Sequence, residues 1–153
     1  MQNQIFNHVL KATLTLALFI TASVSLAQDM NPGFRMLEAG SNAEAKVFFG
    51  KILKKQPDNQ TALICYGRAT GLSGNVAEAQ EVFNKLLVMK PGSEEVLLNL
   101  AESFLWEGNG EEAAKIYTDI LVKNETSFAA LLGYANSMSM IKNRSEERRV
   151  GKD

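Results

Sequence analysis

The sequence contains few of the residues on which most chemical sites depend. It has one cysteine and one histidine among 153 residues. A single cysteine excludes an internal disulfide framework and a zinc or iron–sulfur site with several cysteine ligands. The histidine, His8, lies in a segment that we expect to be removed, so the mature chain has no histidine to activate a nucleophile. We therefore predict no catalytic residue, no metal ligand and no cofactor site, and we do not expect an enzyme.

The chain also has almost no net charge. Lys and Arg number 16 and Asp and Glu number 17, which gives a formal net charge of -1. A protein that binds nucleic acid through its phosphates is usually basic, because each phosphate contact needs a cation. The charge balance therefore argues against a nucleic-acid partner.

The N-terminus has the order of a secretory signal. Residues 1–11 carry one charged side chain, Lys11, and residues 12–26 carry none. Small residues follow at Ser25 and Ala27, the two positions that a signal peptidase inspects. The uncharged run is shorter than the roughly 20 residues that a membrane-spanning helix needs. We expect residues 1–27 to be a signal peptide, cleaved after Ala27, and the mature chain to be exported with no membrane span.

Internal repetition is the strongest signal in the sequence. Gly40, Gly74 and Gly108 are spaced 34 residues apart. Apolar columns repeat at the same interval: Ala45, Ala79 and Ala113; Phe48, Val82 and Ile116; Phe49, Phe83 and Tyr117; Ile52, Leu86 and Ile120; Leu53, Leu87 and Leu121. Within each unit these residues fall at i, i+3, i+4, i+7 and i+8, which is one face of an α-helix. The period predicts an amphipathic helix after each glycine.

A further helix is expected in the other half of each unit. These helices are predicted over residues 60–72, 94–106 and 128–141, and a short one is predicted to begin at Asn31–Pro32, as an N-cap and N1 pair. Ser41 with Glu44 and Asn75 with Glu78 have the spacing of a capping box. Small residues are expected where the paired helices approach closely, with Gly67, Ala101 and Ala135 facing Ala79 and Ala113.

These columns resemble the tetratricopeptide repeat family, whose pattern is W-x2-L-G-x2-Y…A-x3-F…P. Residues 60–93 read Leu63-x2-Tyr66-Gly67, then Ala79-x3-Phe83, then Pro91. The resemblance implies an all-α fold, an α-solenoid of antiparallel helix pairs. Its units would be residues 26–59, 60–93, 94–127 and a truncated unit at 128–143.

The repeat fails in the last ten residues. Residues 144–153 read Arg-Ser-Glu-Glu-Arg-Arg-Val-Gly-Lys-Asp, and Glu147 stands where the period from Ala113 expects a small residue. This run resembles the translation of a widely used sequencing adapter, so we expect residues 144–153 to be non-native and the true protein to be longer. The alternative is a charged, solvated tail, or a basic tail for a partner.

The resemblance also assigns candidate binding residues, because the first helix of each tetratricopeptide unit lines a concave groove. The matching positions are Ile64, Arg68, Leu98, Glu102, Leu105, Trp106, Leu132, Asn136 and Met140. Trp106 and Arg68 are of the types enriched at binding hot spots; the alternative is that Trp106 packs between repeats. Ile64 and Leu98 replace the groove lysines of members that capture a C-terminal carboxylate, so we expect another mode of binding, to an extended peptide or a helix of a partner protein.

Three functions follow as hypotheses. The first is an exported tetratricopeptide-repeat scaffold that mediates protein–protein interaction in the bacterial envelope, periplasmic or secreted. The second is the N-terminal periplasmic part of a longer outer-membrane export protein with a C-terminal β-barrel. The third is an enzyme whose catalytic domain lies beyond these residues. The sequence leaves the oligomeric state open.

Overall fold

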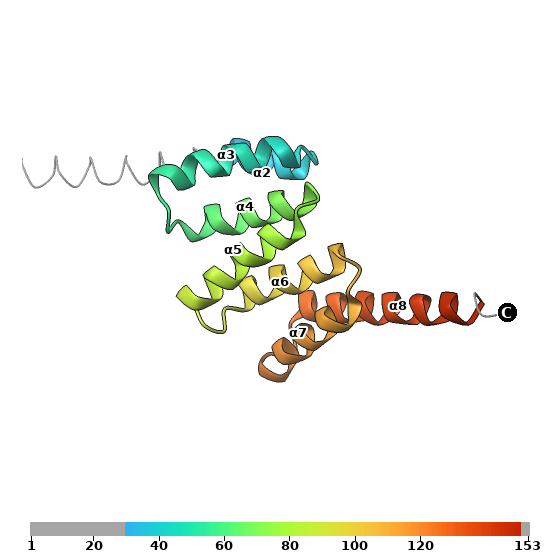
Figure 1. Cartoon of the computed structure of the whole chain (residues 1–153). Helices are drawn as coiled ribbons and strands as arrows, with labels where there is room; N and C mark the ends of the chain where they lie inside the picture. Colours follow the sequence, from blue (N-terminus) through green and yellow to red (C-terminus); the bar gives the residue numbers. More distant parts are fainter. Residues whose placement is uncertain (1–29, 151–153) are drawn as a thin grey trace, which may run out of the picture.

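The computed structural model describes residues 30–150, and every element in this range is a helix (Figure 1). The predicted signal peptide at 1–27 and the last three residues of the predicted tail lie outside the described residues. In order, the helices are α2 (Asn31–Glu38), α3 (Asn42–Lys55), α4 (Gln60–Leu72), α5 (Val76–Met89), α6 (Glu94–Trp106), α7 (Gly110–Lys123) and α8 (Phe128–Val150). None of these described helices is both long and apolar enough to cross a bilayer.

The helices pack as successive pairs. Each helix contacts the next one along the chain, and in addition α4 contacts α6 and α6 contacts α8. The result is an extended array of antiparallel helix pairs rather than a closed bundle (Figure 1). This arrangement confirms the predicted all-α solenoid, and it makes α4, α6 and α8 neighbours although they are far apart in sequence.

The predicted turns are confirmed, and the predicted caps are confirmed in part. Gly40, Gly74 and Gly108 have φ angles of 73°, 95° and 79°, a left-handed conformation that glycine adopts without strain. The Asn75 side chain accepts a hydrogen bond from the Glu78 backbone N–H, as an N-cap does.

Two cap predictions need correction. Ser41 is the N-cap of α3, but its side chain makes no cap hydrogen bond. The N-cap of α2 is Met30, so Asn31 is already helical and Pro32 follows within the first turn. Proline suits either of the first helical positions because the first N–H groups have no partner within the helix.

The core is built from one aromatic ring per unit. Phe49 and Phe83 are fully buried and Tyr117 is 4% exposed. The nearest neighbour of Gly67 is the Phe83 ring and not the predicted Ala79, whereas Gly71, one turn later, lies close to Ala79. Because the Phe83 ring occupies the space beside Gly67, the close contact between small residues is made by Gly71 and Ala79, one turn further along α4. Ala135 is exposed rather than packed against a small partner.

The last helix is longer than predicted. It was expected over 128–141, whereas α8 runs without a break from Phe128 to Val150. The segment after Gly133 contains no glycine or proline, and its Arg and Glu residues favour helix. Residues 142–149 are nevertheless all exposed. On α8 the apolar side chains of Leu131, Tyr134 and Met138 are 47%, 37% and 44% exposed, so this part of the helix has an uncovered apolar face.

Two glycine substitutions test the packing. Gly50→Ala should raise the free energy of unfolding by roughly 0.5–1 kcal/mol, because alanine favours helix and its Cβ would meet only the Tyr66 ring, at 3.5 Å. Gly67→Ala should lower it by about 1–3 kcal/mol, because its Cβ would lie 2.6 Å from the buried Phe83 ring. Urea denaturation measures both changes, and two equally stable variants would contradict this packing.

Hydrogen exchange tests the end of α8. Amides of residues 146–149 should exchange faster than those of residues 79–121, because the side chains of residues 146–149 are all exposed and leave the last turns without packing. Exchange that is equally slow in both segments would show that these turns are held by contacts that the fold described here does not contain.

Candidate functional site

The surface shared by α4, α6 and α8 carries all nine predicted binding residues. We call it the first-helix face, because these three helices open the repeat units at 60–93, 94–127 and 128–143. The three helices contact one another in order, so side chains 34 residues apart lie side by side on it. The packing of the repeats therefore assembles one continuous surface from separate parts of the chain.

A polar cluster joins α4 to α6 on this face. One guanidinium nitrogen of Arg68, Nη1, donates to Asn99 Oδ1 and to Glu102 Oε2, each at 3.2 Å. Asn99 is 7% exposed, and its Nδ2 donates to the carbonyl oxygen of Glu95 at 2.7 Å. The side chains of Arg68 and Glu102 are 39% and 40% exposed, so both keep surface that a ligand could contact.

Trp106 lies between the repeats. Its ring lies against Gly71 of α4, where a Cβ would overlap it. It also packs on the core cluster that contains Phe83 and Leu86, and it remains partly exposed. The inter-repeat packing that the sequence left open is therefore present, and part of the ring still faces outward.

The other predicted residues differ in what they offer a partner. Ile64 is 8% exposed and belongs to the core, so it presents little surface. Leu98 and Leu105 are half-buried against the cluster that contains Ala101. On α8, Leu132 is 53% exposed, Asn136 is exposed and Met140 is half-buried. The accessible part of the face thus runs from Arg68 and Trp106 toward Leu132.

Asn99 and Leu72 also belong to this face although the nine predicted residues do not include them. Asn99 interrupts an otherwise apolar run from Val96 to Leu100, which is a signal that a polar group is needed there. Leu72 is 42% exposed at the end of α4. Leu72 extends the accessible surface, whereas Asn99, which is 7% exposed, holds Arg68 in place beneath it.

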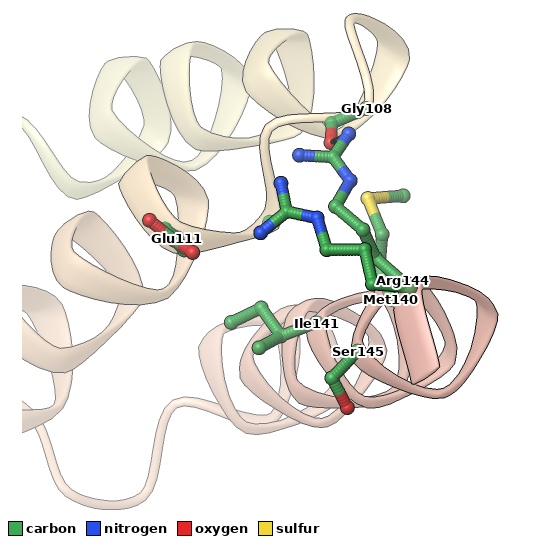
Figure 2. Close-up of a pocket in the computed structure, with 8 residues that line it drawn as sticks. Gly108, Glu111, Met140, Ile141, Arg144 and Ser145 are labelled. Carbon is green, nitrogen blue, oxygen red and sulfur yellow. Dashed lines mark hydrogen bonds between the residues drawn. The ribbon is translucent and has the colours of Figure 1, made fainter. Parts of the chain in front are cut away.

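Two cavities lie where α8 passes the turn before α7. The smaller has a volume of about 80 Å³, and the larger, about 430 Å³, is lined in part by Asn136 and Met140. Figure 2 shows Arg144 of α8 reaching to Gly108, whose carbonyl oxygen accepts a hydrogen bond from Arg144 Nη2 at 2.6 Å. Since Arg144 belongs to the segment that we expect to be non-native, these cavities are not assigned a function.

A second polar cluster joins α3, α4 and α5. Glu78 accepts hydrogen bonds from Lys46 Nζ at 2.7 Å and from the Tyr66 hydroxyl at 2.6 Å. The bonds from Lys46 and Tyr66 lower the pKa of Glu78 below its usual range. The same contact with Glu78 raises the pKa of Lys46 and that of Tyr66.

Catalytic chemistry has little support among the described residues. Cys65 is buried, and desolvation raises the pKa of its thiol to about 11, as expected of a cysteine that serves as a small apolar residue. Within residues 30–150, no three His, Cys, Asp or Glu side chains are grouped as metal ligands would be. What the first-helix face offers is therefore partly exposed apolar and hydrogen-bonding surface.

Comparison with known proteins shows which proteins this helical array is similar to. The tetratricopeptide repeat model matches residues 72–133. A tetratricopeptide repeat protein from Parabacteroides merdae ATCC 43184 is similar in structure, with a TM-score of 0.62 and 27% identity over 81% of this chain and 48% of that one. No curated protein matches the chain.

Two further solved structures share the fold at lower sequence identity. The TPR domain of P58(IPK) has a TM-score of 0.63 and 18% identity, over 78% of this chain and 34% of that one. PcrH, in complex with the chaperone binding region of PopD, has a TM-score of 0.60 and 16% identity, over 81% of this chain and 93% of that one. The chain thus spans about a third of the P58(IPK) chain and about half of the Parabacteroides protein.

Acid titration tests the Glu78 cluster. Because the folded-state pKa of Glu78 lies below its ordinary value of 4.5, its stabilising effect is complete above that value and is lost as the pH falls through the folded pKa. Urea midpoints between about pH 7 and about pH 3 should fall less in Glu78→Gln than in the original chain. Tyr66→Phe, which removes one donor, should give an intermediate dependence, and an unchanged dependence in Glu78→Gln would contradict the assignment.

Proposed function

We propose that this chain, in which residues 72–133 carry tetratricopeptide repeats, is an exported scaffold of the bacterial envelope that holds a segment of a partner protein on its first-helix face. The fold of the described residues is that of a protein-interaction scaffold. The location in the envelope rests on the predicted signal peptide. No residue is assigned a chemical step in this proposal.

The observation that carries the proposal is the composition of the first-helix face. Leu72, Trp106 and Leu132 are apolar and partly exposed, and Arg68 and Glu102 stand among them. Exposed apolar side chains rimmed by a few polar groups are typical of interaction surfaces, since apolar surface without a partner is costly in water. Trp and Arg are also the residue types that most often dominate binding energy.

The cluster around Arg68 favours recognition of backbone groups in an extended segment. Arg68 has five N–H donors, and its bonds to Asn99 and Glu102 involve one nitrogen. Its remaining N–H groups can donate to carbonyl oxygens, while Glu102 can accept from N–H groups. An extended chain presents both kinds of group along its length. PcrH, which shares the fold, is solved with a region of another protein bound to it.

Site-specific photocrosslinking tests this function. A benzoylphenylalanine at position 72 or 132 should crosslink a partner in cells that express the exported chain, because both positions lie on the first-helix face. The matched control is position 88 on α5, where Val88 is 82% exposed and away from that face. Crosslinks from position 88 alone would contradict the proposal.

Arg68→Ala is the companion variant. The pair that Arg68 forms with Glu102 is more than a third exposed, so its loss should cost no more than about 1 kcal/mol of stability. We expect the crosslink from position 72 to weaken while the helical circular dichroism signal stays unchanged. An undiminished crosslink would show that Arg68 takes no part in binding.

Export is tested separately by the N-terminus of the mature protein. Protein sequencing of the periplasmic or secreted fraction should begin at Gln28. Recovery of the chain only from the cytoplasm, with Met1 retained, would contradict the envelope location and leave the binding face to be judged on the crosslinks.

A further inference from the structure

We propose that a cleft between α3 and α4, which we call the lysine cleft, is a second binding site and takes an acidic segment of a partner protein. Its lining includes Lys46, Val47, Gly50, Lys51, Lys54 and Tyr66, and its volume is about 580 Å³. None of these residues is among those assigned to the first-helix face. The proposal therefore concerns a different surface and a different ligand chemistry from the proposed function.

The lysine cleft is a departure from the repeat. One period after Lys46, Gly50 and Tyr66 the chain has Gln80, Asn84 and Leu100. The next unit therefore has no lysine, no glycine and no aromatic ring at these positions. Residues that only maintain the fold recur at the 34-residue interval, as Ala45, Ala79 and Ala113 do. Lys46 and Gly50 do not recur, since two periods later the chain has Ala114 and Thr118, whereas Tyr66 recurs as Tyr134. The repeat architecture therefore accounts for the tyrosine but not for Lys46 or Gly50.

Gly50 keeps the cleft open. It lies in the interior of α3, where glycine weakens a helix. Packing does not require it, because a Cβ there would make only ordinary contact with the Tyr66 ring, at 3.5 Å and 3.9 Å. This contrasts with Gly67, whose replacement would drive a Cβ into Phe83. The effect of Gly50 is to leave the ring of Tyr66 uncovered beside α3.

The charge around the cleft is positive, although the chain as a whole is nearly neutral. Helix α3 contains four lysines and one acidic residue, Glu44. Lys46 is paired with Glu78, whereas Lys51 and Lys54 are exposed and form no ion pair with any residue from 30 to 150. Lys51 and Lys54 stand at the rim of the cleft without an acidic partner. They would therefore attract the carboxylates of a ligand and pair with them.

The floor of the cleft is apolar and held in place. Val47 is 57% exposed beside the Tyr66 ring. Glu78 fixes both polar walls, since it accepts from the Tyr66 hydroxyl and from Lys46, whose Nζ lies 5.6 Å from the centre of the Tyr66 ring. A site whose walls are fixed before binding loses less entropy when a ligand enters. The chemistry that fits is an apolar side chain flanked by carboxylates.

A protein segment fits these features better than a membrane surface. A helix that lies on a bilayer presents a broad apolar face, whereas Val47, 57% exposed, is the one large apolar side chain of α3 among the exposed ones. The cleft is a shallow depression open to solvent, which suits a side chain laid on the surface of the protein rather than a deeply enclosed ligand. Acidic vesicles are accordingly an outcome of the test and not the expected ligand.

The test is fluorescence anisotropy with a defined probe, a fluorescein-labelled peptide Glu-Glu-Glu-Leu-Phe-Glu-Glu-Glu, and the chain from Gln28 onward. The double variant Lys51→Glu, Lys54→Glu should weaken binding by about tenfold or more, since it replaces attraction at the rim by repulsion. The matched control is Lys85→Glu, Lys90→Glu on and just after α5, which changes the net charge equally; Lys85 lies one period after Lys51 and is exposed. This control should bind nearly as the original chain does.

Two further variants serve as separate controls. One tests whether the shape of the lysine cleft matters as well as its charge, and the other tests whether the probe binds the lysine cleft or the first-helix face. Gly50→Leu, which fills the space beside the Tyr66 ring, should weaken binding of the peptide probe without changing the net charge of the chain. Arg68→Ala, on the first-helix face, should leave probe binding unchanged. Circular dichroism of each variant establishes that the helices remain folded, so a loss of binding is not a loss of fold.

Four results would overturn the proposal. These are equal binding of a probe with Gln in place of Glu, equal loss in the Lys85, Lys90 control, and full binding by Gly50→Leu. The fourth is binding to vesicles of phosphatidylcholine with phosphatidylglycerol in the absence of any binding to the peptide, which would assign the lysines to a lipid surface.

Discussion

One buried aromatic ring in each unit, seated against a glycine of a neighbouring helix, is the contact on which the array depends. Phe49 lies against Gly33, Phe83 against Gly67 and Tyr117 against Gly133. Each ring buries a large apolar area, and the glycine lets the two helices approach closely enough to enclose it. The first two contacts join the two helices of one unit, whereas Ala101 stands one period after Gly67 and Tyr117 lies against Gly133 of the following unit. The rings therefore stabilise both the helix pairs and the contact between successive units, as in other repeat proteins.

The same repetition positions the surfaces that could bind a partner. Packing of α4, α6 and α8 side by side places Arg68 next to Glu102 although 34 residues separate them. Residues that recur with the period build the solenoid, whereas residues that break it, such as Lys46 and Gly50, have no equivalent in the next unit. Function in this chain is therefore sought where the sequence departs from its own repeat.

The period predicted most of the fold, because one pattern of apolar residues implies both the helices and their pairing. Helices α4 and α6 begin and end at the predicted residues. The length of α8 was not predicted, because local helix propensity carries the backbone through residues that bury nothing. The contact of Gly67 with the Phe83 ring was not predicted. Which side chain fills the space beside a glycine depends on how two helices pack, and the sequence period does not give this. The Asn99 contact with Arg68 joins two helices, and no spacing within one helix reveals it.

The central claim is that a partner segment lies on the first-helix face. The most direct measurement is an NMR titration of the isotope-labelled chain with the segment that position 72 crosslinks. The account predicts shift changes concentrated at Arg68, Glu102, Trp106 and Asn136, on three helices that meet only in the folded array. Changes confined to the exposed sides of α5 and α7, with the indole N–H signal of Trp106 unmoved, would contradict it.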